Sequence, residues 1–230
     1  MSNMRLILIA LMFSLVACRE TPTPRIRDAA SFAAEASKPW PNNSTINIVF
    51  HGHSVPAGFA VTPVVRTTDA YPYQLLDGLK NAYPFAQINV IVTARGGESA
   101  AQGSERLEEA LSHDPDVLVI DYGLNDVPGT VYAPMQSMAS RAKARGVRTL
   151  LLTPSPDLVE GERLALIRDE VLSAGIDAGV AVVQPRFPTA PSKLMAQRNH
   201  PNRMGHAIIA QALLPHFLPN RLDGQGVPVR

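Results

Sequence analysis

Five short apolar segments constrain the fold of this chain more than any other feature of its sequence. Each is rich in Val, Ile or Leu and lacks sustained polar alternation, which predicts a strand buried on both faces. Residues at helical spacing separate the segments, and a last helix is expected at about Arg203–Phe217. The five predicted strands are Ile46–Phe50, Ile88–Val92, Val117–Ile120, Thr149–Leu152 and Val180–Val183.

The alternation of strands and helices predicts the fold class. Strand, helix and next strand in repetition indicate right-handed βαβ crossovers and a parallel sheet. We therefore expect an α/β fold, a flavodoxin-like three-layer α/β/α sandwich with a five-stranded parallel sheet. The chain has 230 residues, 46% of them hydrophobic, which is enough for one such domain over residues 45–230. Ligands of this architecture bind at the carboxyl ends of the strands.

The amino-terminal sequence pattern predicts an export signal. A short basic region, Met1–Arg5, precedes an apolar run, Leu6–Val16, which is too short for a folded membrane span. The sequence Leu-Val-Ala-Cys that ends at Cys18 resembles the lipobox of bacterial lipoproteins. That resemblance implies a signal peptide over residues 1–17, cleavage before Cys18, and acylation of this cysteine with chains such as palmitate. The alternative is an ordinary secretory leader with a chance cysteine near its end.

Either signal exports the protein, and the lipobox places it on the cell envelope, at the outer or inner membrane facing the periplasm. Residues 18–44 are rich in Pro, Ala, Ser and Thr, which predicts a flexible tether, with Trp40 packing its end on the domain. Removal of the leader leaves 20 basic and 20 acidic side chains, so no excess of charge points to nucleic acid. The expected partners are a small-molecule or glycan substrate and, through the anchor, a membrane.

Polar residues follow four of the predicted strands. Ser54 follows the first, Gly97 the second and Asn125 the third, and His200 lies in the loop after the fifth. Acyl transfer needs a nucleophile, a base and donors for the developing oxyanion. Ser54 can attack and His200 can take its proton, while the N–H groups of Ser54 and Gly97 and the amide of Asn125 can form the oxyanion hole.

The order Ser, Gly, Asn, His along the chain resembles that of the SGNH (GDSL-like) hydrolase family. The four blocks are Gly-His-Ser at Ser54, Gly-Glu-Ser at Gly97, Gly-Leu-Asn-Asp at Asn125 and His-Pro-Asn at His200. The resemblance implies a serine esterase that needs no metal or organic cofactor and hydrolyses small acyl esters, such as acetyl groups on carbohydrates. Lysophospholipase or general short-chain esterase activity is the alternative within this family.

Two positions depart from the family pattern. His53 stands where the family has Asp before the nucleophile, and Gln197 stands where the family has the Asp that orients the catalytic histidine. Loss of that carboxylate leaves four candidates to hold the imidazole of His200: Gln197, a main-chain carbonyl, Asp126 or Glu98. The sequence does not choose among them.

Two further functions remain open. His51 and His53 are two residues apart, so they can share one face of a strand and hold a metal ion with His200 or Asp126. Alternatively, the chain is a lipoprotein that keeps the fold, binds its ligand and has lost its chemistry.

Overall fold

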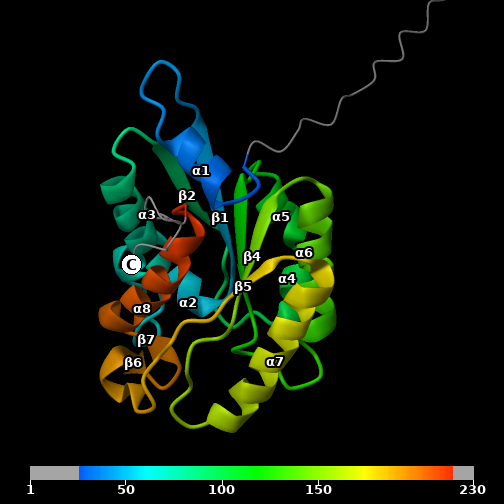
Figure 1. The fold of residues 1–230 in the computed structure, drawn as a ribbon. Coiled ribbons are helices and arrows are strands. Elements are labelled where there is room, and N and C mark those ends of the chain that lie inside the picture. The colour runs from blue at the N-terminus through cyan, green and yellow to red at the C-terminus, as the bar shows by residue number, and fades with distance from the viewer. Residues whose placement is uncertain (1–25, 220–230) are drawn as a thin grey trace, which may run out of the picture.

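The computed structural model describes residues 26–219 and contains the predicted parallel sheet (Figure 1). The five strands lie in the order β2-β1-β3-β4-β5, and every neighbouring pair is parallel. The predicted fold class is therefore confirmed, and each predicted strand is present with its ends shifted by at most two residues. The strands are β1 (Thr45–Gly52), β2 (Gln87–Val92), β3 (Val117–Asp121), β4 (Arg148–Leu152) and β5 (Ala181–Val183).

Helices cover both faces of the sheet. Figure 1 shows α1, α3 and α8 on one side and α4, α5, α6 and α7 on the other, as the alternating crossovers require. The central strand β3 is buried along its whole length, which explains its continuous apolar sequence. The α-helices are α1 (Ala29–Ala36), α2 (Ser54–Ala57), α3 (Tyr71–Ala82), α4 (Ala100–Glu105), α5 (Leu107–Leu111), α6 (Tyr132–Ala144), α7 (Gly161–Ala178) and α8 (Arg203–Leu213).

Shorter elements lie mostly at the carboxyl edge of the sheet. Strands β6 (Met195–Gln197) and β7 (His200–Pro201) form a small antiparallel pair, which the sequence patterns do not predict. The last helix ends four residues earlier than expected, at Leu213, and continues as a 3-10 turn, because Pro215 has no N–H group to donate. The 3-10 turns are η1 (Thr67–Asp69), η2 (Pro191–Leu194) and η3 (Leu214–His216).

The expected tether is in part a packed element of the domain. Asp28 and Ser31 form a capping box that begins α1, and Phe32 is fully buried with its ring centroid 5.8 Å from that of Tyr83 and 5.0 Å from that of Phe217. The prediction of a flexible segment up to residue 44 was therefore wrong over α1. Trp40 does not fasten this segment to the domain either, since 81% of it is exposed.

The signal peptide and Cys18 lie outside the described residues. Within residues 26–219, none of the helices combines the length and the apolar character that crossing a bilayer requires.

Candidate active site

Ser54 begins helix α2 directly after strand β1. Its N–H belongs to the first turn of that helix, so it has no acceptor within the helix and is free for a ligand. Gly52 permits this sharp strand-to-helix turn, because a Cβ atom there would lie 2.5 Å from the carbonyl oxygen of Asp121 and 2.8 Å from Cγ of Pro56. The local sequence thus fixes the serine at the carboxyl edge of the sheet.

His53, the first departure from the family pattern, caps helix α2. Its Nδ1 accepts a hydrogen bond from the N–H of Val55 at 3.2 Å, as the carboxylate of a capping Asp would. The ring therefore carries its proton on Nε2, which faces Oδ1 of Asp121 at 3.6 Å, too far for a hydrogen bond. Burial lowers the pKa of His53 to about 3, so the ring is neutral at pH 7.

Asp121 lies beneath this turn and is also fully buried. Burial raises its pKa to about 7, although the hydroxyl of Tyr71 donates to Oδ2 at 3.0 Å and acts in the opposite direction. Burial thus favours the neutral form of both His53 and Asp121 at the base of the nucleophile turn.

Ser54 and His200 form the central contact of the site. Oγ of Ser54 lies 2.9 Å from Nε2 of His200, although 146 positions separate the two residues in the sequence. On the far side of the ring, Nδ1 lies 3.0 Å from the carbonyl oxygen of Ala60. A carbonyl only accepts, so Nδ1 carries the proton, and Nε2 presents its lone pair to the serine hydroxyl.

The protonation state of His200 fits a general base. Burial lowers the pKa of this imidazole from its ordinary value of 6.5, and the bond to Ala60 opposes that shift. The ring is therefore neutral at pH 7, in the tautomer that can accept the proton of Ser54.

The main-chain carbonyl is thus the one of the four candidate groups that holds His200. Gln197 pairs with His200 across the β6–β7 turn, but its Oε1 accepts the N–H of Thr62 at 2.8 Å. Gln197 therefore fastens the β6–β7 turn to the loop that carries Ala60 and does not orient the ring itself. Gln197, one of the candidates that the sequence left open, is therefore not the group that replaces the missing Asp.

Asp126 and Glu98 are likewise engaged elsewhere. The carboxylate of Asp126 accepts the N–H of Ala100 at 3.0 Å and that of Gly123 at 3.2 Å, so it stabilises the turn that contains Asn125. Asp126, another candidate that the sequence left open, does not orient His200, because both of its carboxylate oxygens accept backbone N–H groups of this turn and of α4.

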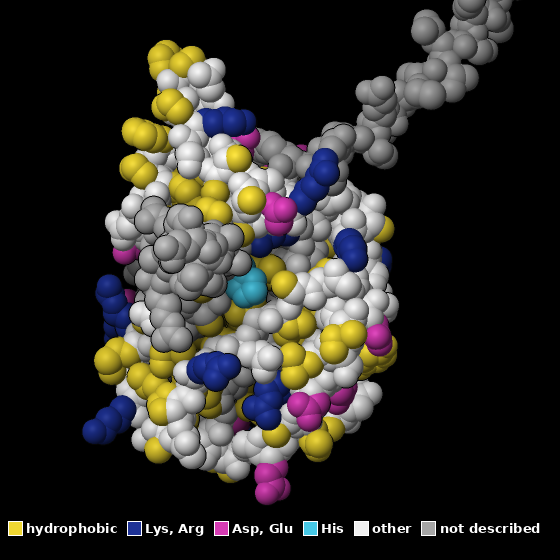
Figure 2. All heavy atoms as spheres, in the orientation of Figure 1, with side chains coloured by type: hydrophobic (Ala, Val, Ile, Leu, Met, Phe, Trp, Pro, Cys, Tyr) yellow, Lys and Arg dark blue, Asp and Glu magenta, His cyan; other side chains and the backbone are white. Residues whose placement is uncertain are grey.

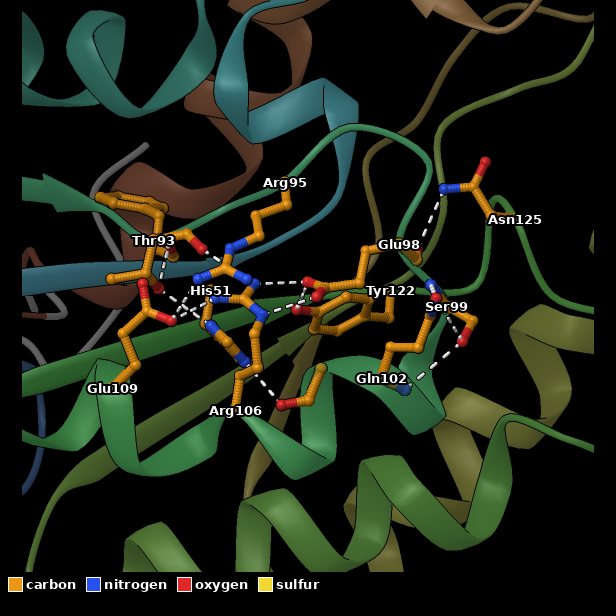
Figure 3. Close-up of polar contacts among 12 residues, drawn as sticks. His51, Thr93, Arg95, Glu98, Ser99, Gln102, Arg106, Glu109, Tyr122 and Asn125 are labelled. Carbon is orange, nitrogen blue, oxygen red and sulfur yellow. Dashed lines mark hydrogen bonds and ion pairs between the residues drawn. The ribbon is translucent and has the colours of Figure 1, made fainter.

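The three expected oxyanion donors lie on adjoining segments. Nδ2 of Asn125 donates to the carbonyl of Glu98 at 3.0 Å, which joins its turn to Gly97 (Figure 3). The second proton of this amide remains for a ligand. Gly97 has a φ of +79°, and no atom lies within 4 Å of the position that a Cβ would take there, so its outer side is open.

Phe59 links this region to His200. Its ring lies 2.9 Å from the position of a Cβ on Gly96, and its centroid lies 6.0 Å from that of the His200 ring. The glycine segment and the imidazole therefore share one aromatic neighbour.

A buried polar network supports the Gly97 segment, and the sequence patterns did not predict it (Figure 3). Arg106 forms two hydrogen bonds to the carboxylate of Glu98, with Nε to Oε1 at 2.6 Å, and also donates to the carbonyl of Thr93. Tyr122 donates to the same carboxylate at 2.9 Å. Burial raises the pKa of Glu98, but the bonds from Arg106 and Tyr122 outweigh it and bring the pKa below its ordinary value. Glu98 is thus a fixed anion and not a proton donor.

His51 belongs to this network and does not face the active site. Its ring nitrogens contact the hydroxyl of Thr93 and the carbonyl of Gly103, both at 2.9 Å. Both nitrogens are therefore used, and His51 and His53 make separate contacts instead of sharing a ligand. Across residues 26–219, no three His, Cys, Asp or Glu side chains lie together in a way that could hold a metal ion. His206 accepts the N–H of Tyr71 and packs within the domain.

Comparison with known proteins gives a consistent result. The model of the GDSL-like Lipase/Acylhydrolase family matches residues 50–208, a range that contains all four blocks. An acetylxylan esterase from Geobacillus stearothermophilus has a TM-score of 0.63 at 21% identity, over 76% of this chain and 97% of that chain. A lipase/acylhydrolase from Enterococcus faecalis has a TM-score of 0.61 at 18% identity, over 80% and 99% of the two chains. The search of curated proteins gave no match.

The geometry predicts the protonation behaviour of His200. Titration of the imidazole signals by ¹⁵N NMR should give a midpoint for His200 below 6.5, with the proton of the neutral ring on Nδ1, because burial disfavours the charged ring and Ala60 accepts at Nδ1. The variant His200→Gln assigns the signal by removing it. A midpoint above 6.5, or a neutral ring with its proton on Nε2, would contradict the described contacts.

Proposed function

The chain belongs to the GDSL-like lipase/acylhydrolase family and is a carboxylic ester hydrolase, and from this premise we propose that it is a serine esterase of small acyl esters, acetyl esters in particular. The observation that carries the proposal is the contact of 2.9 Å between Oγ of Ser54 and Nε2 of His200, at the carboxyl edge of a parallel sheet. Two features support a small acyl group. Structurally similar proteins include acetylxylan esterases, and Phe59 occupies space beside Gly96 and His200.

The proposed reaction begins with the transfer of the Ser54 proton to Nε2 of His200. Oγ then forms a bond to the ester carbonyl carbon, and the carbonyl oxygen becomes an oxyanion that accepts hydrogen bonds from the N–H groups of Ser54 and Gly97 and from Asn125. His200 gives its proton to the leaving alcohol as the carbon–oxygen bond breaks, which leaves an acyl-enzyme. Water next attacks this acyl group with His200 as the base, and Ser54 regains its proton when the acid leaves.

The carbonyl of Ala60 replaces part of what a carboxylate supplies. In serine protease triads, exchange of the orienting Asp for Asn lowers turnover by about 10⁴, because the amide stabilises the wrong tautomer. A carbonyl has no proton to donate, so Ala60 holds the productive tautomer. It lacks the negative charge that would stabilise the imidazolium, and we therefore expect a competent but slower esterase.

The first test is hydrolysis of p-nitrophenyl acetate. Ser54→Ala and His200→Ala should each lower kcat by about 10³-fold or more, because the nucleophile and the base act as one unit. Ser137→Ala is the matched control, since this serine lies on α6, away from the carboxyl edge. Circular dichroism checks that each variant is folded. Equal turnover by Ser54→Ala and the wild type would refute the mechanism, and turnover that EDTA abolishes would contradict a metal-independent serine esterase.

We also propose that the protein is exported and anchored to the cell envelope through a lipid on Cys18. The lipobox supports this, and the described part of the chain begins at Ile26 beside α1, at the end of the sheet opposite to α2 and the β6–β7 pair (Figure 1). An anchor attached there would turn the site away from the bilayer surface.

Fractionation of cells that express the full chain tests the anchor. The wild type should be found with membranes and incorporate radiolabelled palmitate, and Cys18→Ser should do neither, because this side chain and the amine freed by cleavage would carry the acyl chains. An equal share of Cys18→Ser in washed membranes would contradict lipid anchoring.

A further inference from the structure

A cavity opens at the carboxyl edge of the sheet, next to the candidate active site. It has a volume of about 700 Å³ and lies between the segment that follows β4 and the segment that follows β5. Figure 1 shows these two segments running side by side below the sheet, towards α7 and towards β6. Small-molecule sites have volumes of about 300–1,000 Å³, so this cavity is large enough for a saccharide unit.

The walls of the cavity are fixed to the two segments that carry Asn125 and His200. Pro154, in one wall, lies 3.6 Å from the position of a Cβ on Gly123, two residues before Asn125. The neighbouring Leu158 donates its N–H to the carbonyl of Arg198 at 3.0 Å, two residues before His200. The cavity is therefore connected to the segments that supply Asn125 and His200.

The lining is cationic. Arg168 of α7 and Arg186 of the segment after β5 both line the cavity, and neither guanidinium has a hydrogen bond or an ion pair with a residue in the described range 26–219. Asp157 is the one carboxylate of the lining, and the guanidinium of Arg198 neutralises it at 2.9 Å. In Figure 2, Lys and Arg side chains lie on this face between the β6–β7 pair and α7, with Asp and Glu side chains beside them.

Two more side chains suit a polar ligand. The hydroxyl of Ser155 is buried in the same wall and has no hydrogen-bond partner among the described residues, which costs free energy unless something else satisfies it. Phe187 is half-buried and gives the lining an aromatic group, on which the apolar face of a sugar ring can pack.

We propose that this cavity binds an anionic group on the alcohol part of the ester, so that the preferred substrates are acylated acidic saccharides. The proposal rests on the esterase function proposed above. Guanidinium groups bind carboxylates and phosphates through paired hydrogen bonds, and two of them on separate segments can clamp one anion. The anion is either the carboxylate of a uronic acid or a sugar phosphate.

Three acetylated sugars that differ in one group test the proposal: a methyl hexoside, the corresponding methyl hexuronide and the corresponding hexoside phosphate. The wild type should show a higher kcat/KM for at least one anionic ester than for the neutral one, mainly through KM, and the preference should shrink at 0.5 M salt because the arginines are exposed to solvent. A preference for the uronide alone identifies a carboxylate site, and a preference for the phosphate alone identifies a phosphate site.

Substitution of the arginines connects the preference to the cavity. Arg168→Gln and Arg186→Gln should each lower the ratio of anionic to neutral kcat/KM by about two- to fivefold, as expected for a solvent-exposed ion pair. The double variant should remove the preference. Arg145→Gln is the matched control, because this exposed arginine ends α6 at the opposite edge of the sheet and should leave the ratio unchanged.

The failure of this proposal can be distinguished from failure of the esterase function. Hydrolysis of p-nitrophenyl acetate that depends on Ser54, with equal kcat/KM for the neutral and anionic sugars, would overturn the anion site alone. Calorimetry with Ser54→Ala and an unacetylated oligohexuronide or hexose phosphate measures the cavity without chemistry. Binding that is lost in Arg168→Gln/Arg186→Gln supports the site, and binding that this double variant leaves unchanged overturns it.

Discussion

The hydrogen bond from Nδ1 of His200 to the carbonyl of Ala60 is the interaction on which the site depends, because it decides which nitrogen faces Ser54. A backbone acceptor is useful only if the backbone is fixed. Two backbone hydrogen bonds fix the loop around Ala60. The N–H of Ala60 donates to the carbonyl of Val64 at 3.0 Å, and the N–H of Arg66 donates to the carbonyl of Gly58 at 2.8 Å. Tight loop geometry therefore replaces a charged side chain as the means of orienting the base, and Gln197 strengthens it through its bond to this loop at Thr62.

Elsewhere in the site, too, charged side chains lie away from the reacting atoms. The charged pair of Glu98 and Arg106 lies on the side of the glycine segment, where it positions Gly97 and Asn125 without touching the reacting atoms. Around the nucleophile turn, burial keeps His53 neutral. An ester is uncharged and its transition state carries one negative charge, so a site with neutral groups at the base and preorganised donors at the oxyanion is suited to it. A formal charge enters the proposed binding scheme only in the cavity lined by Arg168 and Arg186.

Sequence patterns predicted the sheet, its crossovers and the segments that supply Ser54, Gly97, Asn125 and His200, because buried strands and polar strand ends have local signatures. Other features had no local signature of this kind. The Ala60 carbonyl is common to every residue, so no side chain marks it as the orienting group. The capping function of His53 arises from a ring nitrogen that replaces a carboxylate oxygen. Helix α1 is short and lies in a segment of tether-like composition, and its stability comes from the packing of Phe32 against residues far along the chain.

The most direct test of the account is covalent labelling of the nucleophile. A fluorophosphonate should modify the folded protein once, and peptide mass spectrometry should place the adduct on Ser54. The rate of labelling should fall by about 10²-fold or more in His200→Ala, because the base no longer takes the proton of Ser54. An adduct on another residue, or an equal rate of labelling without His200, would contradict the central claim that a carbonyl-held histidine activates Ser54.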